Sequence, residues 1–188
     1  EVAPTSGGNL VVNDSSFTAL SSIGQSAAIN SDGITTINNS TFSSNSGLGD
    51  GGAISIWGLG TFKVSDSSFD LNSATDSGGA IWSEGGLVEV VNSTFNSNTA
   101  QSSGGAINGP LVNVDNSTFN SNTVSNSTGD TTYGGAISGD EVEIDNSTFY
   151  GNTSANGAAA FVGSIGGSSL ISNSTFWNNK ATVVDAGS

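Results

Sequence analysis

Carboxylates are the side chains of this sequence best able to do chemistry, because the usual catalytic bases and nucleophiles are missing. The 188 residues include 16 Asp and Glu against two lysines, and they contain no His, Cys or Arg. Several carboxylates fall at alternating, outward positions of neighbouring repeats, namely Glu89, Asp115, Glu141, Glu143 and Asp145. Two carboxyl groups about 5–9.5 Å apart suffice for glycoside hydrolysis, and several converging oxygens bind calcium. A solvated acidic face is the simplest interpretation, so we expect no enzyme, no catalytic residue and no bound metal or cofactor beyond weak surface calcium.

The strongly negative net charge limits the classes of partner that the protein can bind. A net charge of −14 and the absence of any basic cluster exclude nucleic acid as an expected partner. The longest apolar stretch, around 158–162, is far too short to span a bilayer, so we expect no membrane insertion. Composition changes nowhere along the chain, which predicts a single domain over residues 1–188.

The elements that must position these side chains follow from an internal repeat. Phenylalanine recurs every 24–30 residues, at Phe17, Phe42, Phe69, Phe95, Phe119, Phe149 and Phe176. A β-branched residue precedes each Phe by five positions, within a stretch in which apolar and polar residues alternate, and this alternation is typical of a half-buried strand. Self-similarity with this period is typical of a solenoid. We therefore predict an all-β fold, a parallel β-helix of about seven coils and about 34 Å in length, with a strand, a turn and another strand in each coil.

Two further positions of the repeat are nearly invariant. Three residues after the Phe comes an asparagine in six of the repeats, at Asn45, Asn72, Asn98, Asn122, Asn152 and Asn179, whereas the first repeat has Leu20. Amide side chains at one fixed position can hydrogen-bond from coil to coil, so we expect a core ladder of stacked Phe and Asn. A Gly-Gly-Ala-Ile run follows in most repeats, which predicts a corner with a positive φ and with small side chains where the backbone crowds.

The Gly-Gly-Ala-Ile and Phe-x-x-Asn motifs together resemble the repeats of polymorphic outer-membrane-protein passengers. The first motif covers residues 51–54, 78–81, 104–107 and 134–137, and the second begins at each Phe from Phe42 onward. This resemblance implies a right-handed parallel β-helix, displayed on the cell surface as in autotransporter passengers and adhesins. It is specific for the fold and says little about function.

The tripeptide Asn-Ser-Thr makes a second recurring motif, which is formally an acceptor for N-glycosylation. It begins at Asn39, Asn92, Asn116, Asn146 and Asn173. The repeat itself can require these residues, with Asn in a ladder and Ser and Thr at a turn. Asn126 stands in a six-residue insertion outside the repeat pattern, so it is the best single candidate for a glycan.

Aromatic residues at outward positions supply a candidate contact surface. Tyr150 and Trp177 occupy the same position of adjacent repeats, and Tyr133, Trp57 and Trp82 fall in the segments of variable length. Adjacent exposed rings pack against each other, contact a second protein or stack on a sugar.

The ends of the solenoid favour one function over the others. No amphipathic capping helix is apparent, and the repeats leave complementary edges at the two ends, which a head-to-tail contact would join into an open filament. We therefore expect an extracellular structural protein of the cell surface whose main partner is itself. A segment of a larger adhesin that binds a glycan or a host receptor is the alternative, and a carbohydrate-active enzyme is a third.

Overall fold

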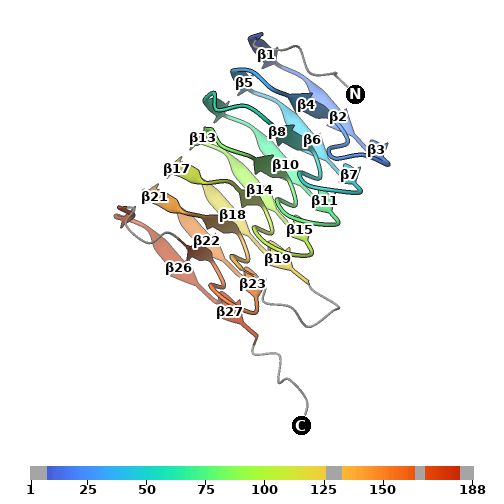
Figure 1. Ribbon diagram of the computed structural model, residues 1–188. Helices are drawn as coiled ribbons and strands as arrows, with labels where there is room; N and C mark the ends of the chain where they lie inside the picture. Colours follow the sequence, from blue (N-terminus) through green and yellow to red (C-terminus); the bar gives the residue numbers. More distant parts are fainter. Residues whose placement is uncertain (1–7, 126–132, 164–167, 183–188) are drawn as a thin grey trace.

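The computed structural model describes residues 8–125, 133–163 and 168–182, and the chain winds through them as a parallel β-solenoid (Figure 1). Successive coils lie above one another along one axis, and all strand pairs are parallel. Three sheets have seven strands and a fourth has six. The expected all-β parallel solenoid is therefore confirmed. Asn126 lies outside the described residues.

The first six coils each contribute four short strands, one to each sheet, where the sequence predicted two, and the last described coil contributes three. The first sheet comprises β1 (Leu10–Asn13), β5 (Thr35–Asn38), β9 (Phe62–Ser65), β13 (Leu87–Val91), β17 (Leu111–Asp115), β21 (Glu141–Asp145) and β25 (Leu170–Ile171). The second comprises β2 (Ser16–Thr18), β6 (Thr41–Ser43), β10 (Ser68–Asp70), β14 (Thr94–Asn96), β18 (Thr118–Asn120), β22 (Thr148–Tyr150) and β26 (Thr175–Trp177). The third comprises β3 (Ser21–Ser22), β7 (Ser46–Gly47), β11 (Ser73–Ala74), β15 (Thr99–Ala100), β19 (Thr123–Val124), β23 (Thr153–Ser154) and β27 (Lys180–Ala181). The fourth comprises β4 (Ile29–Ser31), β8 (Ile54–Ile56), β12 (Ile81–Ser83), β16 (Ile107–Asn108), β20 (Ile137–Gly139) and β24 (Ala160–Val162). Strands of two residues are too short to show an alternating pattern, so the sequence did not predict the third sheet.

The register of the second sheet places every repeat phenylalanine on the next. Phe42 pairs with Phe69 and Phe69 with Phe95, and the same pairing holds from Phe17 to Phe176. Neighbouring rings stack with centroids 4.7–4.8 Å apart and planes within 9° of parallel. The five rings from Phe42 to Phe149 are fully buried. The aromatic stack, together with the valines and isoleucines of the first and fourth sheets, forms the core.

A ladder of buried asparagines runs beside the Phe stack. The Asn98 side chain donates from Nδ2 to Asn122 Oδ1 at 3.0 Å and to the Phe69 carbonyl at 2.9 Å, and its Oδ1 accepts from the backbone N–H and the Nδ2 of Asn72, both at 3.0 Å. The same pattern joins Asn45, Asn72, Asn98, Asn122, Asn152 and Asn179. Each amide thus binds the coils on both sides, and this fixes the register where the strands are shortest.

The corners on either side of the Phe strand take left-handed backbone conformations. The residue three before each Phe has φ between 46° and 51°, and the residue two after it has φ between 52° and 66°. Asn and Asp fill the first corner in every coil because they tolerate this conformation. At the glycine corner, the first glycine has a positive φ, as at Gly78 with 67°. The second is crowded, since a Cβ on Gly79 would lie 2.1 Å from the Gly105 carbonyl oxygen.

Candidate functional site

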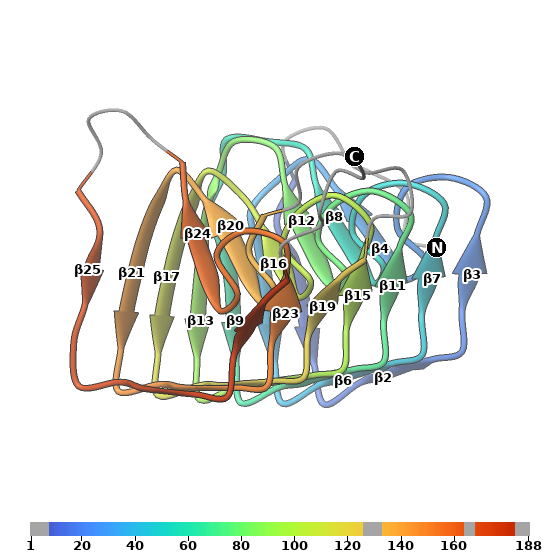
Figure 2. The same ribbon diagram turned by 90° about the horizontal axis from the view of Figure 1, so that it is seen from below.

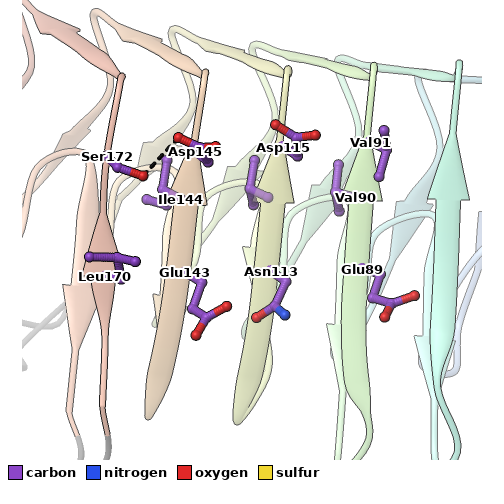
Figure 3. A pocket seen from close by; sticks show the side chains of 11 residues that line it. Glu89, Val90, Val91, Asn113, Asp115, Glu143, Ile144, Asp145, Leu170 and Ser172 are labelled. Atoms are coloured by element: carbon purple, nitrogen blue, oxygen red, sulfur yellow. Dashed lines mark hydrogen bonds between the residues drawn. The ribbon is translucent and has the colours of Figure 1, made fainter.

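The acidic positions lie together on the outer face of the first sheet, as Figure 3 shows. Glu89, Asp115, Glu143 and Asp145 line a groove of about 550 Å³ that crosses β13, β17, β21 and β25. Glu141 begins β21 in the same sheet but does not line the groove. Four of the five predicted carboxylates therefore lie on one groove, among apolar and amide side chains.

Register arranges the groove side chains in two rows. One row reads Glu89, Asn113, Glu143 and Leu170, and the other reads Val91, Asp115 and Asp145. Asp115 and Asp145 are one strand spacing apart, about 4.8 Å at the backbone. Glu89 and Glu143 have Asn113 between them in the row, so they are two strand spacings apart, about twice the separation of Asp115 and Asp145.

Two of these carboxylates already have partners within the protein. Asp145 accepts hydrogen bonds from the Ser172 hydroxyl at 2.7 Å and from the Asn173 amide at 2.9 Å, and these hold its pKa below the ordinary value. Glu89 forms an ion pair with Lys63 at 2.7 Å. Burial raises the pKa of Asp50, which lies outside the groove. Among the described residues, no three His, Cys, Asp or Glu side chains are grouped so that they could hold a metal ion.

The exposed asparagines of the Asn-Ser-Thr motif hydrogen-bond to Asp or Asn side chains of the preceding coil. The Asn116 amide donates to Asn92 Oδ1 at 2.6 Å, and the Asn39 amide donates to Asp14 Oδ1 at the same distance. All five of these asparagines have positive φ, including Asn146 and Asn173 at 48°. Backbone conformation and coil-to-coil hydrogen bonding therefore account for Asn at this position, and glycosylation stays a prediction.

The outward aromatic residues separate into distinct groups. The rings of Tyr150 and Trp177 stack with centroids 4.9 Å apart, and Trp177 is 68% exposed. Tyr133 packs against Phe161 instead, with centroids 4.3 Å apart. Trp82 lies within β12, not in a loop as the sequence suggested, and contacts Trp57. Tyr150 and Trp177 are therefore the aromatic pair available at the C-terminal end of the second sheet.

The last described coil leaves exposed the apolar positions that every inner coil buries. Phe176 is 40% exposed, whereas Phe149 one coil earlier is fully buried. Ile171 is 52% exposed, whereas its neighbour in register, Ile144, is 1% exposed. Among the described residues, β25, β26 and β27 have a strand neighbour on one side only. This coil therefore presents apolar side chains and unpaired backbone groups on the same face, which we call the terminal face.

The Asn ladder has a direction, and it ends differently at its two ends. Asn179 accepts from the N–H and the Nδ2 of Asn152, at 3.0 and 2.8 Å, and donates to the Phe149 carbonyl. Its remaining amide hydrogen has the orientation that, in inner coils, meets the Oδ1 of the following coil. At the opposite end, Leu20 donates its backbone N–H to Asn45 Oδ1 at 3.2 Å and has no amide of its own to continue the ladder.

A serine ladder was missed by the sequence reasoning. The backbone N–H of Ser67 donates to Ser93 Oγ at 3.1 Å, while the Ser67 hydroxyl donates to the Ser65 carbonyl. The same arrangement continues through Ser15, Ser40, Ser93, Ser117, Ser147 and Ser174. Serine is present two residues before every repeat Phe, and this invariance was the available signal.

Comparison with known proteins agrees with the motifs. Residues 39–56, 66–84 and 92–110 match the Chlamydia polymorphic membrane protein repeat. No curated protein and no solved structure matches significantly. The described residues include no helix long and apolar enough to cross a membrane.

Proposed function

Because the chain is a parallel β-solenoid that carries repeats of the polymorphic-membrane-protein type, we propose that it is a non-enzymatic structural protein of the cell surface that stacks end to end with further copies of itself. The matched repeats support the coarser part of this proposal, an outer-membrane or surface location. End-to-end assembly into a filament or sheath is the finer part. It rests on the terminal face.

The exposure of the terminal face is the observation that carries the proposal. Burial of an aromatic or branched aliphatic side chain contributes about 1.5–3 kcal/mol, and Phe176 and Ile171 forgo much of this gain. A further coil placed on this face would cover both and pair the free edges of β25, β26 and β27. The first coil of another copy has the matching residue types, because Val12 and Phe17 occupy the same two positions of the repeat.

Leu20 makes this contact weaker than the contacts between inner coils. Asn179 would face Leu20 across the junction, so its amide hydrogen would lack the acceptor that an inner coil supplies. One unsatisfied donor costs about 1–3 kcal/mol. The proposed contact is therefore held by backbone pairing and by the apolar side chains, without the Asn ladder.

A pair of adjacent substitutions tests the proposal. Ile171→Asp places a charge on the terminal face, whereas Leu170→Asp places the same charge on the outer row that already contains Glu143. We expect sedimentation velocity to show large assemblies for the natural chain and for Leu170→Asp, and single chains for Ile171→Asp. Assemblies of equal size in all three proteins would refute end-to-end stacking through this face.

The Tyr150–Trp177 stack favours a second candidate, the passenger segment of an adhesin. Large exposed aromatic surfaces on soluble proteins mark contact sites for partners. A substitution Trp177→Ser that abolishes attachment to host cells, while the size of the assemblies is unchanged, would favour this function over the filament.

A further inference from the structure

A trough on the outer face of the fourth sheet is bounded by aromatic rings at both ends. The outward residues of four successive strands, β12, β16, β20 and β24, are Trp82, Asn108, Ser138 and Phe161. Figure 2 shows these strands side by side. The two middle strands, β16 and β20, have small polar residues at the position where β12 and β24 have aromatic rings. The result is a depression of about 270 Å³, which we call the trough.

Glycine and a polar corner complete the walls of the trough. Gly109 and Gly139 follow its two polar floor residues and leave the floor without side chains at these points. Three residues after the isoleucine of each strand, the chain places Glu84, Pro110 and Asp140 along one side. The trough therefore combines flat apolar ends with a floor and a wall that carry hydrogen-bonding groups.

The hydrogen-bonding groups of the floor are free to meet a ligand. The side chains of Asn108 and Ser138 have no hydrogen-bond partner in residues 8–125, 133–163 and 168–182. An amide and a hydroxyl each donate and accept, whereas the two carboxylates only accept. A ligand with several hydroxyl groups can satisfy all four residues at once.

The aromatic ends are held in place by other rings. Trp82 contacts Trp57, with centroids 4.8 Å apart and planes tilted by 59°, and Phe161 contacts Tyr133. Trp57 belongs to the coil on the other side of Trp82 from Asn108, so it supports Trp82 from behind. A ring fixed by its neighbours loses less side-chain entropy when a ligand stacks on it.

Spacing along the solenoid argues against an aromatic cage and against a metal site in the trough. Trp82 and Phe161 are three strand spacings apart, about 14 Å at the backbone. A single ammonium group needs aromatic rings within about 6 Å, so the two ends cannot form a cage around one. Glu84 and Asp140 are two spacings apart, about 10 Å at the backbone, and they belong to no group of three His, Cys, Asp or Glu side chains that could hold a metal ion among the described residues.

We propose that the trough binds an uncharged saccharide of one or two sugar rings. A pyranose ring stacks on the indole of Trp82, and hydroxyl groups of the saccharide hydrogen-bond to Asn108, Ser138, Glu84 and Asp140. The volume lies near the lower limit of small-molecule pockets, which sets the size of the ligand. The two carboxylates and the net charge of −14 repel uronic acids and sulfated sugars. This site does not depend on end-to-end stacking.

Calorimetric titration with defined saccharides tests the proposal. The probes are cellobiose, lactose and N,N′-diacetylchitobiose as uncharged disaccharides, with digalacturonate as the anionic control. We expect at least one uncharged disaccharide to bind, and digalacturonate to bind at least tenfold more weakly. Absence of binding by all three uncharged probes, or stronger binding of digalacturonate, would overturn the proposal.

Three variants locate the binding site. Trp82→Ala removes the stacking surface and Asn108→Phe fills the trough, and we expect each to weaken binding of the saccharide at least tenfold. Trp177→Ala removes an exposed aromatic ring of the second sheet, outside the trough, and should leave the affinity unchanged. Far-UV circular dichroism and thermal unfolding show whether each variant keeps the fold. Loss of binding in Trp177→Ala alone would place the sugar at the Tyr150–Trp177 stack and refute the assignment to the trough.

Discussion

Removal of the Asn98 side chain tests whether the buried ladder holds the coils together. The Asn98→Ala variant loses four hydrogen bonds, two that the side-chain amide donates and two that its Oδ1 accepts. Two buried donors then lack partners, namely the backbone N–H of Asn72 and one amide hydrogen of Asn72, whereas the Phe69 carbonyl keeps its place in the ladder between β10 and β14. Asn122 Oδ1 keeps its bond from the backbone N–H of Asn98 at 3.0 Å.

The free energy of unfolding should fall by about 3 kcal/mol in Asn98→Ala. Each buried group without a partner costs about 1–3 kcal/mol, and water entering the space vacated by the amide keeps the sum in the lower part of that range. Total stability of a domain is about 5–15 kcal/mol, so the loss is a large fraction of it. Urea denaturation followed by circular dichroism measures the change.

Asn179→Ala is the matched control at the end of the same ladder. Its side chain also accepts from the preceding asparagine and donates to a Phe carbonyl, but these bonds are only partly buried. Groups freed there can bind water, so we expect a loss of about 1 kcal/mol. Equal losses in the two variants, or a loss below about 1 kcal/mol in Asn98→Ala, would show that the ladder does not stabilise the stack in the way described.

For three further variants, the structure predicts whether stability rises or falls. Leu71 is 61% exposed and has a φ of 58°, so Leu71→Asn should raise the free energy of unfolding by about 1 kcal/mol. Leu48→Asn is the control, because Leu48 is equally exposed but has no positive φ, and it should not raise the free energy of unfolding. Equal urea midpoints for the two variants would refute this prediction. The pKa of Asp145 is lowered in the folded state, so the contribution of Asp145 to stability is present above the ordinary pKa of 3.8 and is lost as pH falls through the folded pKa. Ser172→Ala removes one of the hydrogen bonds that lower this pKa, so urea midpoints measured below pH 5 should depend less on pH in this variant. A pH profile identical to that of the natural chain would contradict this prediction. Burial raises the pKa of Asp50, and the negative charge of Asp76 adds to the rise. The ionised form is therefore disfavoured in the fold, and stability is lost as pH rises through the folded pKa. Asp50→Asn should stabilise the protein at neutral pH, and a urea midpoint below that of the natural chain would refute this prediction.

The parts of the fold that repeat could be predicted from the sequence, because each invariant position has one environment in every coil. The repeat Phe and Asn residues identified the aromatic stack and the amide ladder, since only stacked coils explain such spacing. The third sheet was missed because strands such as Ser73–Ala74 have no alternating pattern. The serine ladder was missed because Ser next to Asn is typical of turns.

The candidate sites were harder to predict because they arise where the repeat is broken. Trp82 and Phe161 follow the isoleucine or alanine of their strands at the same position as Asn108 and Ser138, so the sequence contained the register of the trough. It did not show that small residues in two adjacent coils would leave a hollow between two rings. The acidic groove could be anticipated as a surface, but the hydrogen bonds from Ser172 and Asn173 to Asp145 depend on the corner after β25.

Electron microscopy of the purified chain at physiological ionic strength tests end-to-end stacking most directly. The net charge of −14 opposes contact between copies, and salt screens it over about 8 Å at 0.15 M, so assembly should increase with ionic strength. We expect rods of uniform width with an axial repeat of about 34 Å, seven strand spacings per copy. Monodisperse short particles at every salt concentration would contradict the account of this protein as a filament subunit.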